Sequence, residues 1–169
     1  QAERNGVNDG RMISFEEAWR RVMAAARPLG EETAPLEAAG GRVLSRDVRS
    51  DVDMPPFDKS AMDGFACRAA DLDRTLDIVG EAPAGKIPDF AIEPGTCARI
   101  MTGGVVPEGA DTVVMVEHTR IEDGRMVVTK RSAARNICKR AEDVRAGETV
   151  LRRGTLVTPA ETAVLAAVG

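Results

Sequence analysis

The sequence predicts a mixed α and β fold that is mainly β, with a β-rich lobe inserted into a lobe of helices and strands. Two observations support this prediction. Helical signals, an amphipathic stripe in the first case and capping residues in the second, occur near the two ends of the 169-residue chain. The middle holds short apolar runs separated by glycine-rich turns, which is typical of strands. We therefore expect a helix-and-strand domain of residues 12–50 and 144–169, a β-rich domain of residues 51–143, and a flexible tail of residues 1–11.

The first helix is expected over residues 14–29. Ser14 occupies the N-cap position, and Glu17 stands where a capping box requires an acid. Pro28 and Gly30 end the pattern. Between these signals, apolar residues recur at steps of three and four and form one stripe, which consists of Phe15, Ala18, Trp19, Val22, Met23 and Ala26. We expect this helix to pack with the last strands and the last helix of the chain.

Strands are expected next, on both sides of a long loop. Residues 42–48 alternate like a strand. Residues 51–64 contain two prolines and four aspartates, which excludes a regular element and predicts a loop of the kind that carries function. Further short strands are expected at residues 76–79, 97–101, 112–121 and 126–130. The pair Asp123-Gly124 between the last two predicts a hairpin.

The end of the chain predicts a strand pair and a helix. The pair is expected around residues 147–151 and 154–157. Thr158 as N-cap, Pro159 at the first helical position and Glu161 in a capping box predict a helix that runs to residue 168. Gly169 is the expected C-terminal cap, and we expect that the chain is a piece cut at a domain boundary.

Composition excludes several classes of function. Aromatic residues make up 3% of the chain and the net charge is −4, which disfavours proteins that bind nucleic acid by base stacking or phosphate contacts. No apolar run approaches the length of about 20 residues that a membrane helix needs. Three separated cysteines and one histidine make a zinc site hard to assemble. We expect a cytoplasmic protein with no nucleic-acid or membrane partner.

Two turns contain residues suited to chemistry. Asp63 precedes a glycine in the long loop, where its carboxylate could hold Mg²⁺ or position a water. The alternative is an Asp-Gly turn in which the carboxylate bonds only its own backbone. Thr102 precedes Gly103 and Gly104 at the end of a predicted strand, which could form an anion-binding nest. The alternative there is an ordinary tight turn.

A basic run at residues 130–140 is followed directly by two acids. Five positive charges without an acid could form an anion site or a docking patch, or simply a solvated loop. Glu142 and Asp143 could take part in binding a metal-bridged polyphosphate, or could form surface ion pairs of little energetic worth. Beside this run, the thiol of Cys138 could have a lowered pKa.

Together these stretches resemble one family. Residues 55–66 read Pro-Pro-Phe-Asp-x-Ser-Ala-Met-Asp-Gly-Phe-Ala, and residues 98–117 read Ala-Arg-Ile-Met-Thr-Gly-Gly-x-Val-Pro-Glu-Gly-Ala-Asp-x-Val-Val-Met-x-Glu. Residues 136–143 read Asn-Ile-x-x-x-x-Glu-Asp. In order and spacing these motifs resemble those of the MoeA, or molybdopterin molybdenumtransferase, family, which includes the gephyrin E-domain. The resemblance extends over residues 12–169.

The resemblance implies the fold, an activity and partners. Members of the family insert molybdate into adenylylated molybdopterin with Mg²⁺ and release AMP, in molybdenum cofactor biosynthesis. They are elongated homodimers that associate through domain I, with an active site shared between the subunits. The resemblance thus implies domains I and II, with molybdopterin adenylyltransferase as the upstream partner. Without a molybdopterin-binding domain, this fragment alone is expected to be inactive. The alternative is a non-catalytic dimerisation or scaffolding module of the gephyrin E-domain type.

The resemblance also implies roles for individual residues. Catalytic roles fall on Asp63, Asp143 and Thr102, with the two aspartates as metal ligands. Substrate-binding roles fall on Ser60, Lys59, Gly103, Asn136, Lys139 and Arg140.

Three positions depart from the family pattern. Lys59 stands where Asn is common, Cys138 where a basic residue is common, and Ala141 where Gly is common. We expect a shift of the loop to let Lys139 or Arg140 replace the missing charge. Otherwise the anion site has decayed.

Overall fold

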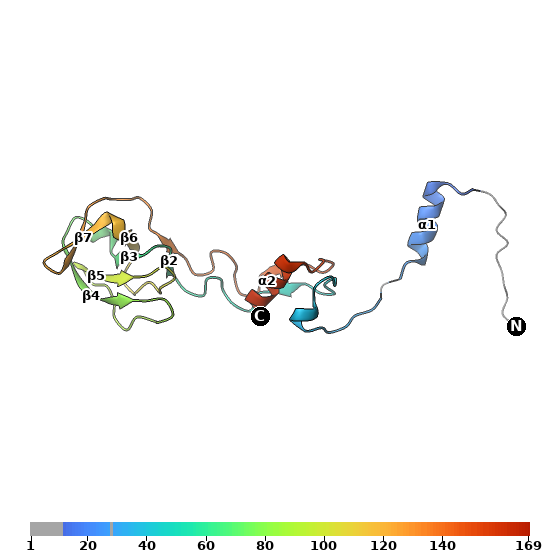
Figure 1. Cartoon of the computed structure of the whole chain (residues 1–169), viewed down its shortest axis with the longest axis horizontal. Helices are drawn as coiled ribbons and strands as arrows, with labels where there is room; N and C mark the ends of the chain where they lie inside the picture. The colour runs from blue at the N-terminus through green and yellow to red at the C-terminus, as the bar shows by residue number, and fades with distance from the viewer. Residues whose placement is uncertain (1–11, 28) are drawn as a thin grey trace. The chain divides into compact units, whose positions relative to one another are not determined.

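The computed structural model describes residues 12–27 and 29–169, so the tail predicted at residues 1–11 lies outside the described residues. The chain divides into two compact units, Gln1–Ala34 and Pro35–Gly169. Figure 1 shows that the first contains helix α1 and the second contains every strand and helix α2.

Helix α1 spans Phe15–Ala25 and begins as predicted, because the Ser14 hydroxyl accepts a hydrogen bond from the Glu17 backbone N–H at 3.2 Å. It ends four residues before the expected position. Pro28 disfavours helical backbone at Arg27, and the chain is already extended at Ala26. The Arg27 guanidinium donates to the carbonyl oxygens of Ala24 and Ala26 and satisfies the end of the helix.

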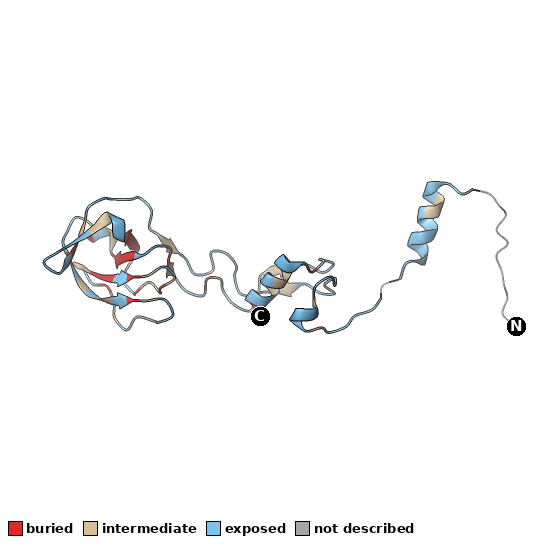
Figure 2. Ribbon diagram, viewed as in Figure 1, coloured by how far each residue is buried: buried red, intermediate tan, exposed pale blue. Residues whose placement is uncertain are grey.

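The apolar stripe of α1 is exposed. No residue of the helix is buried, and Figure 2 shows the whole helix as exposed or intermediate. Phe15 and Trp19 stack on one another with ring centroids 6.5 Å apart. Packing of this helix against the last strands and helix of the chain stays a prediction.

The second unit is organised around a six-stranded sheet with the strand order β6-β3-β5-β4-β8-β7. Neighbouring strands are antiparallel except for β4 and β5, which are parallel. The strands span Gly64–Cys67 (β3), Leu76–Ala82 (β4), Thr96–Ile100 (β5), Thr112–Met115 (β6), Thr119–Glu122 (β7) and Arg125–Val128 (β8). The mainly β fold predicted from the sequence is thus confirmed.

Strand β3 lies between β5 and β6 and is buried on both faces. Because side chains alternate along a strand, its residues contribute to two apolar clusters. Phe65 and Cys67 belong to the larger cluster, which also contains Leu76, Cys97, Val114 and Met126. Ala66 belongs to the smaller one, which also contains Ala82, Ile100 and Val113. This rigid sheet positions the loops at its ends.

The predicted hairpin is confirmed. Strands β7 and β8 are joined through Asp123 and Gly124, whose φ angles of 47° and 80° suit a type I′ turn. The prediction of one continuous strand over residues 112–121 is wrong, because the structure has two strands there with a break between them. A 3₁₀ turn at Val116–His118 separates β6 from β7, because β3 begins at Gly64 and offers β6 no partner beyond Met115.

The chain ends of the second unit pair with each other. Strand β1 (Val48–Arg49) pairs with β10 (Thr149–Leu151), and Val43 bridges to Leu156. The strand expected over residues 42–48 is therefore wrong over most of its length. The two late strands pair with this earlier segment and not with each other. Helix α2 (Pro159–Val168) begins with the predicted capping box at Thr158.

Two connecting segments run side by side between the sheet and α2 (Figure 1), one within residues 51–61 and one within residues 136–147. They are joined by strands β2 (Lys59–Ser60) and β9 (Ile137–Cys138) and by the bridge from Met54 to Val144. The predicted domain boundaries lie on these segments and stay a prediction. Over the described residues, neither helix has the length and apolar character of a membrane span.

Candidate functional site

Asp63 and Thr102 meet where β3 begins and β5 ends. The antiparallel register pairs Gly64 with Ile100, which places the residue before β3 beside the turn after β5. Asp63 Oδ1 accepts hydrogen bonds from the Thr102 backbone N–H at 2.7 Å and from the Thr102 hydroxyl at 2.8 Å. The carboxylate therefore bonds from the start of β3 to the turn after β5, and the isolated Asp-Gly turn considered from the sequence is ruled out.

These two bonds set the charge of Asp63. The backbone N–H of Thr102 contributes most, and its hydroxyl contributes next, to holding the pKa of Asp63 below its usual value. The side chain is exposed and ionised at neutral pH. Among the described residues, no hydrogen bond engages Oδ2, so this oxygen keeps its capacity to accept a further ligand.

The turn after β5 is a support for Asp63 and not an anion nest. The N–H of Gly103 donates to the Ser60 carbonyl at 2.8 Å, and that of Gly104 donates to Met101 at 2.8 Å. With the Thr102 N–H bound to Asp63, all three N–H groups of the turn are used within the protein. The nest considered from the sequence is therefore wrong, and Gly103 supports the turn through its φ of 80°.

Ser60 is also satisfied internally. Its side chain is 1% exposed, and its hydroxyl donates to the carbonyl of Met62 at 2.5 Å. Asn136, which has a φ of 53°, donates from Nδ2 to the Val113 carbonyl at 2.9 Å. Its own carbonyl accepts the N–H of Ala61. Both residues fix the loops around the site, and the Ser60 hydroxyl is not available as a donor to a ligand.

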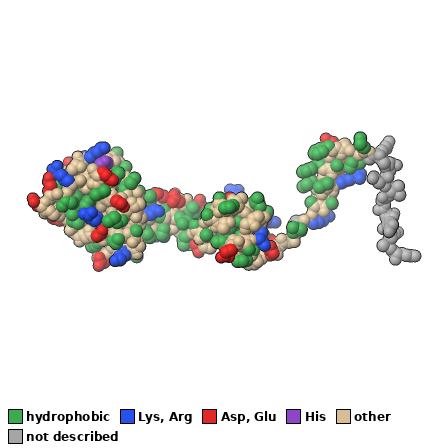
Figure 3. All heavy atoms as spheres, in the orientation of Figure 1, with side chains coloured by type: hydrophobic (Ala, Val, Ile, Leu, Met, Phe, Trp, Pro, Cys, Tyr) green, Lys and Arg blue, Asp and Glu red, His purple; other side chains and the backbone are tan. Residues whose placement is uncertain are grey.

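The basic run is paired with aspartates from distant parts of the chain. Four ion pairs join Arg131 to Asp73, Arg135 to Asp111, Lys139 to Asp58, and Arg140 to Asp53. Figure 3 shows basic and acidic side chains interspersed over the face in view. The run is therefore mostly neutralised, and the four aspartate partners are site-flanking residues that sequence reasoning missed.

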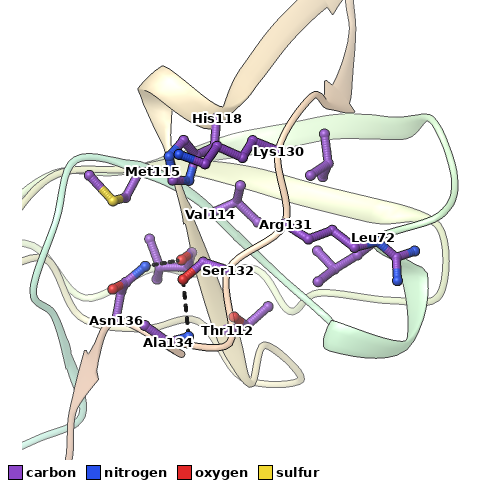
Figure 4. A pocket seen from close by; sticks show the side chains of 12 residues that line it. Leu72, Thr112, Val114, Met115, His118, Lys130, Arg131, Ser132, Ala134 and Asn136 are labelled. Atoms are coloured by element: carbon purple, nitrogen blue, oxygen red, sulfur yellow. Dashed lines mark hydrogen bonds between the residues drawn. The ribbon is translucent and has the colours of Figure 1, made fainter.

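A shallow pocket lies beside the same run. His118, Lys130, Ser132 and Asn136 are among its lining residues, with apolar side chains from β6 and β8. Figure 4 shows Arg131 extending past Leu72, away from His118. The pocket lies over the sheet, and neither Asp63 nor Asp143 lines it.

Three cations are predicted to bind substrate, and two of them, Lys139 and Arg140, are paired with aspartates; Lys59 is the third. It lies opposite Cys138 in the β2–β9 ladder and forms no ion pair with any described residue. Loss of solvent contributes most to raising the pKa of the Cys138 thiol, and a hydrogen bond to Glu142 contributes next. The interpretation that this thiol has a lowered pKa is therefore wrong. Lys59 acts against this shift as a nearby positive charge.

Asp143 lies on the exposed turn that follows β9. Its backbone N–H donates to the Met54 carbonyl at 3.0 Å, and the neighbouring Glu142 carboxylate accepts the N–H of Lys139 at 2.7 Å. Asp63 and Asp143 thus lie toward opposite ends of the paired connecting segments. Within the part of the chain that is described, no three His, Cys, Asp or Glu residues form a group that could hold a metal.

The arrangement fits Mg²⁺ in a limited way. Mg²⁺ is commonly bound by one or two carboxylates, with water and substrate phosphate completing its shell. The anchored, ionised carboxylate of Asp63 fits one such ligand, whereas the exposed Asp143 lies toward the other end of the connecting segments and does not join it there. A cage made by the protein alone does not fit.

Comparison with known proteins gives consistent matches. A family model described as the MoeA N-terminal region (domain I and II) matches residues 13–169. Molybdopterin molybdenumtransferase 2 of Mycobacterium tuberculosis is 41% identical over 94% of the chain and 41% of its own length. Molybdopterin molybdenumtransferase of Nostoc sp. is 42% identical over 80% of the chain and 33% of its own length.

Solved structures agree. The crystal structure of a molybdopterin biosynthesis MoeA protein from Pyrococcus horikoshii has a TM-score of 0.86 and 33% identity, and the match covers 94% of this chain and 44% of that one. The chain therefore spans between a third and somewhat less than half of the length of these relatives.

Proposed function

The chain belongs to the MoeA N-terminal family, and we propose that it supplies domains I and II of a molybdopterin molybdenumtransferase. The proposed reaction inserts molybdate into adenylylated molybdopterin and releases AMP. Relatives that bear the name of this activity are two to three times as long as the matched segment. We therefore propose that the rest of the site comes from a molybdopterin-binding domain, and that residues 1–169 alone have no turnover.

The observation that best supports this proposal is the double hydrogen bond from Thr102 to Asp63 Oδ1. It holds an ionised carboxylate at the start of β3, and no hydrogen bond from the described residues engages the other oxygen. Asp63 would bind Mg²⁺. When bound, this ion would neutralise negative charge on the phosphate of the adenylate. Thr102 orients Asp63, and Lys59 would attract the oxyanion. Asp143 would supply a second carboxylate to the reaction, apart from the metal ligand Asp63, because it lies toward the other end of the connecting segments.

The same proposal includes partners and location. The full-length protein would act in the cytoplasm as a homodimer that associates through domain I, with each active site built from two subunits. Molybdopterin adenylyltransferase would supply the adenylylated substrate. An enzyme with an anionic substrate needs positive charge near its site and not over its whole surface. The net charge of −4 agrees with this, as does Lys59, which forms no ion pair with the described residues.

The test is reconstitution with the full-length protein, adenylylated molybdopterin, molybdate and Mg²⁺. Wild-type protein should release AMP in a molybdate-dependent reaction, and Asp63→Asn should slow it on the order of a hundredfold. Asp77→Asn is the control, because Asp77 on β4 is also an exposed aspartate and forms its ion pair with Arg125 on β8, away from Thr102. If Asp63→Asn were as active as the control, the assignment of Asp63 would be wrong.

A second candidate is a non-catalytic dimerisation or scaffolding module. The exposed stripe of α1 favours it, because Phe15 is 78% and Trp19 58% exposed. Under this alternative, sedimentation would show that Trp19→Ala dissociates an assembly while molybdate-dependent AMP release is absent from wild-type protein.

A further inference from the structure

Asp58 holds the turn that carries Asp143. Its Oδ1 accepts the backbone N–H of Arg140 at 2.8 Å, and its Oδ2 accepts the ammonium of Lys139 at 2.7 Å. Asp58 is partly buried, with a side chain 38% exposed. Both of its oxygens are therefore committed to one short stretch of chain that lies 81 and 82 residues away in sequence.

Asp53 holds the same turn farther along. Its Oδ2 accepts the Arg140 guanidinium at 2.6 Å, and its Oδ1 accepts the backbone N–H of Ala146 at 2.9 Å. Its side chain is only 17% exposed. Together the two residues, called here the aspartate clamp, attach residues 139–146 at both ends.

The turn needs such support. Ala141 has a φ of 59°, in the left-handed region that residues with a Cβ adopt at a cost. Its N–H reaches the Pro55 carbonyl at 2.9 Å, and that of Asp143 reaches the Met54 carbonyl at 3.0 Å. These bonds exist only while the turn stays against the 53–58 segment, which is what the aspartate clamp enforces.

We propose that Asp58 and Asp53 are positioning residues for the proposed reaction. They engage Lys139 and Arg140, hold the turn of residues 139–146, and thereby fix Asp143 along the segment that leads to Asp63. Lys139 and Arg140 then serve the turn, and Lys59 is left as the cation for the substrate. This inference rests on the proposed function, because it gives Asp143 a role in the reaction.

Hydrogen exchange on residues 1–169 tests the clamp itself. Asp58→Asn preserves shape and removes the charge, and it should speed exchange of the Arg140, Ala141 and Asp143 amides by about tenfold or more. Asp77→Asn should leave them unchanged. Lys139→Met is a second variant, because Lys139 is 59% exposed and its replacement leaves the core intact. Unchanged exchange of the turn in both Asp58→Asn and Lys139→Met would overturn the proposal.

Kinetics of the full-length protein test the positioning role. Asp58→Asn should lower kcat for AMP release on the order of tenfold and change KM for molybdate less than twofold. In an Asp143→Asn background, the same change should have no further effect. A merely structural role would lower activity equally in both backgrounds, and that result would overturn the proposal.

The two proposals fail differently. If wild-type protein releases no AMP, or Asp143→Asn is fully active, the proposed function or its assignment of Asp143 fails, and with it the positioning role. If Asp143→Asn is impaired and Asp58→Asn is not, the positioning role alone fails.

Discussion

At the scale of single residues, the contact between Asp63 and Thr102 connects local structure to chemistry. For the proposed role of metal ligand, a carboxylate benefits from an oxygen held in one position and from a lowered pKa that keeps it ionised. The Thr102 hydroxyl and N–H supply both, because they converge on Oδ1 from the same residue.

Replacing Thr102 tests this coupling. Thr102→Val removes the hydroxyl bond and keeps the backbone bond, so the pKa of Asp63 should rise part of the way to its ordinary value. Nuclear magnetic resonance titration of the Asp63 carboxyl measures it. Thr96→Val, at the other end of β5, is the control, since its hydroxyl bonds only to Glu93. An unchanged pKa of Asp63 in Thr102→Val would contradict the assigned contact.

Lowering the pH should protonate the two carboxylates of the aspartate clamp and weaken their hydrogen bonds within a defined pH range. For Asp58, the Lys139 ammonium contributes most to lowering the pKa below 3.8, and for Asp53 the Ala146 N–H does. Groups whose pKa is lowered on folding stabilise above the unfolded pKa and lose that effect as pH falls through the folded one. The Arg140 and Ala146 amide signals should therefore hold down to about pH 4 and move below it. Movement complete above pH 4 would contradict the lowered pKa values.

At the scale of elements, tight turns at the ends of the inner strands determine where the site residues lie. Gly104 is the clearest case. A Cβ there would lie 2.5 Å from the Ala82 carbonyl oxygen and 2.9 Å from that of Met101, both backbone atoms. The turn that carries Thr102 therefore approaches β4 as closely as a backbone can.

Gly104→Ala should destabilise the chain by about 1–3 kcal/mol, because backbone must move to admit the methyl group. Urea unfolding of residues 1–169 measures it. Gly40→Ala is the matched control, since nothing lies within 4 Å of a Cβ at that position. Equal stability of the two variants would show that the turn does not pack against Ala82.

The sequence predicted elements well where the determinants are local. The hairpin at Asp123-Gly124 and the capping box at Thr158 depend on neighbours within four residues, and both are confirmed. The end of α1 and the break between β6 and β7 were missed. The latter depends on where β3 begins, some 50 residues earlier in the chain, which no local pattern reports.

The candidate site was predictable in part for the same reason. Asp63 and Thr102 stand in recognisable turns, and the resemblance implied both. The partners of the basic run were not predictable, because the ion pairs of Lys139 and Arg140 join residues 81 to 87 positions apart. Only the antiparallel course of the two connecting segments brings those charges together, so an apparent anion site turns out to be largely neutralised.

At the scale of the whole molecule, we propose that this chain contributes Asp63 to molybdenum cofactor synthesis by a longer protein. Nitrate reductase activity in a bacterial host that lacks its own molybdenumtransferase tests it most directly. The full-length protein and its Asp77→Asn variant should restore the activity, and Asp63→Asn should restore on the order of a hundredfold less. Restoration by Asp63→Asn to the level of Asp77→Asn, or none by the wild-type protein, would contradict the account.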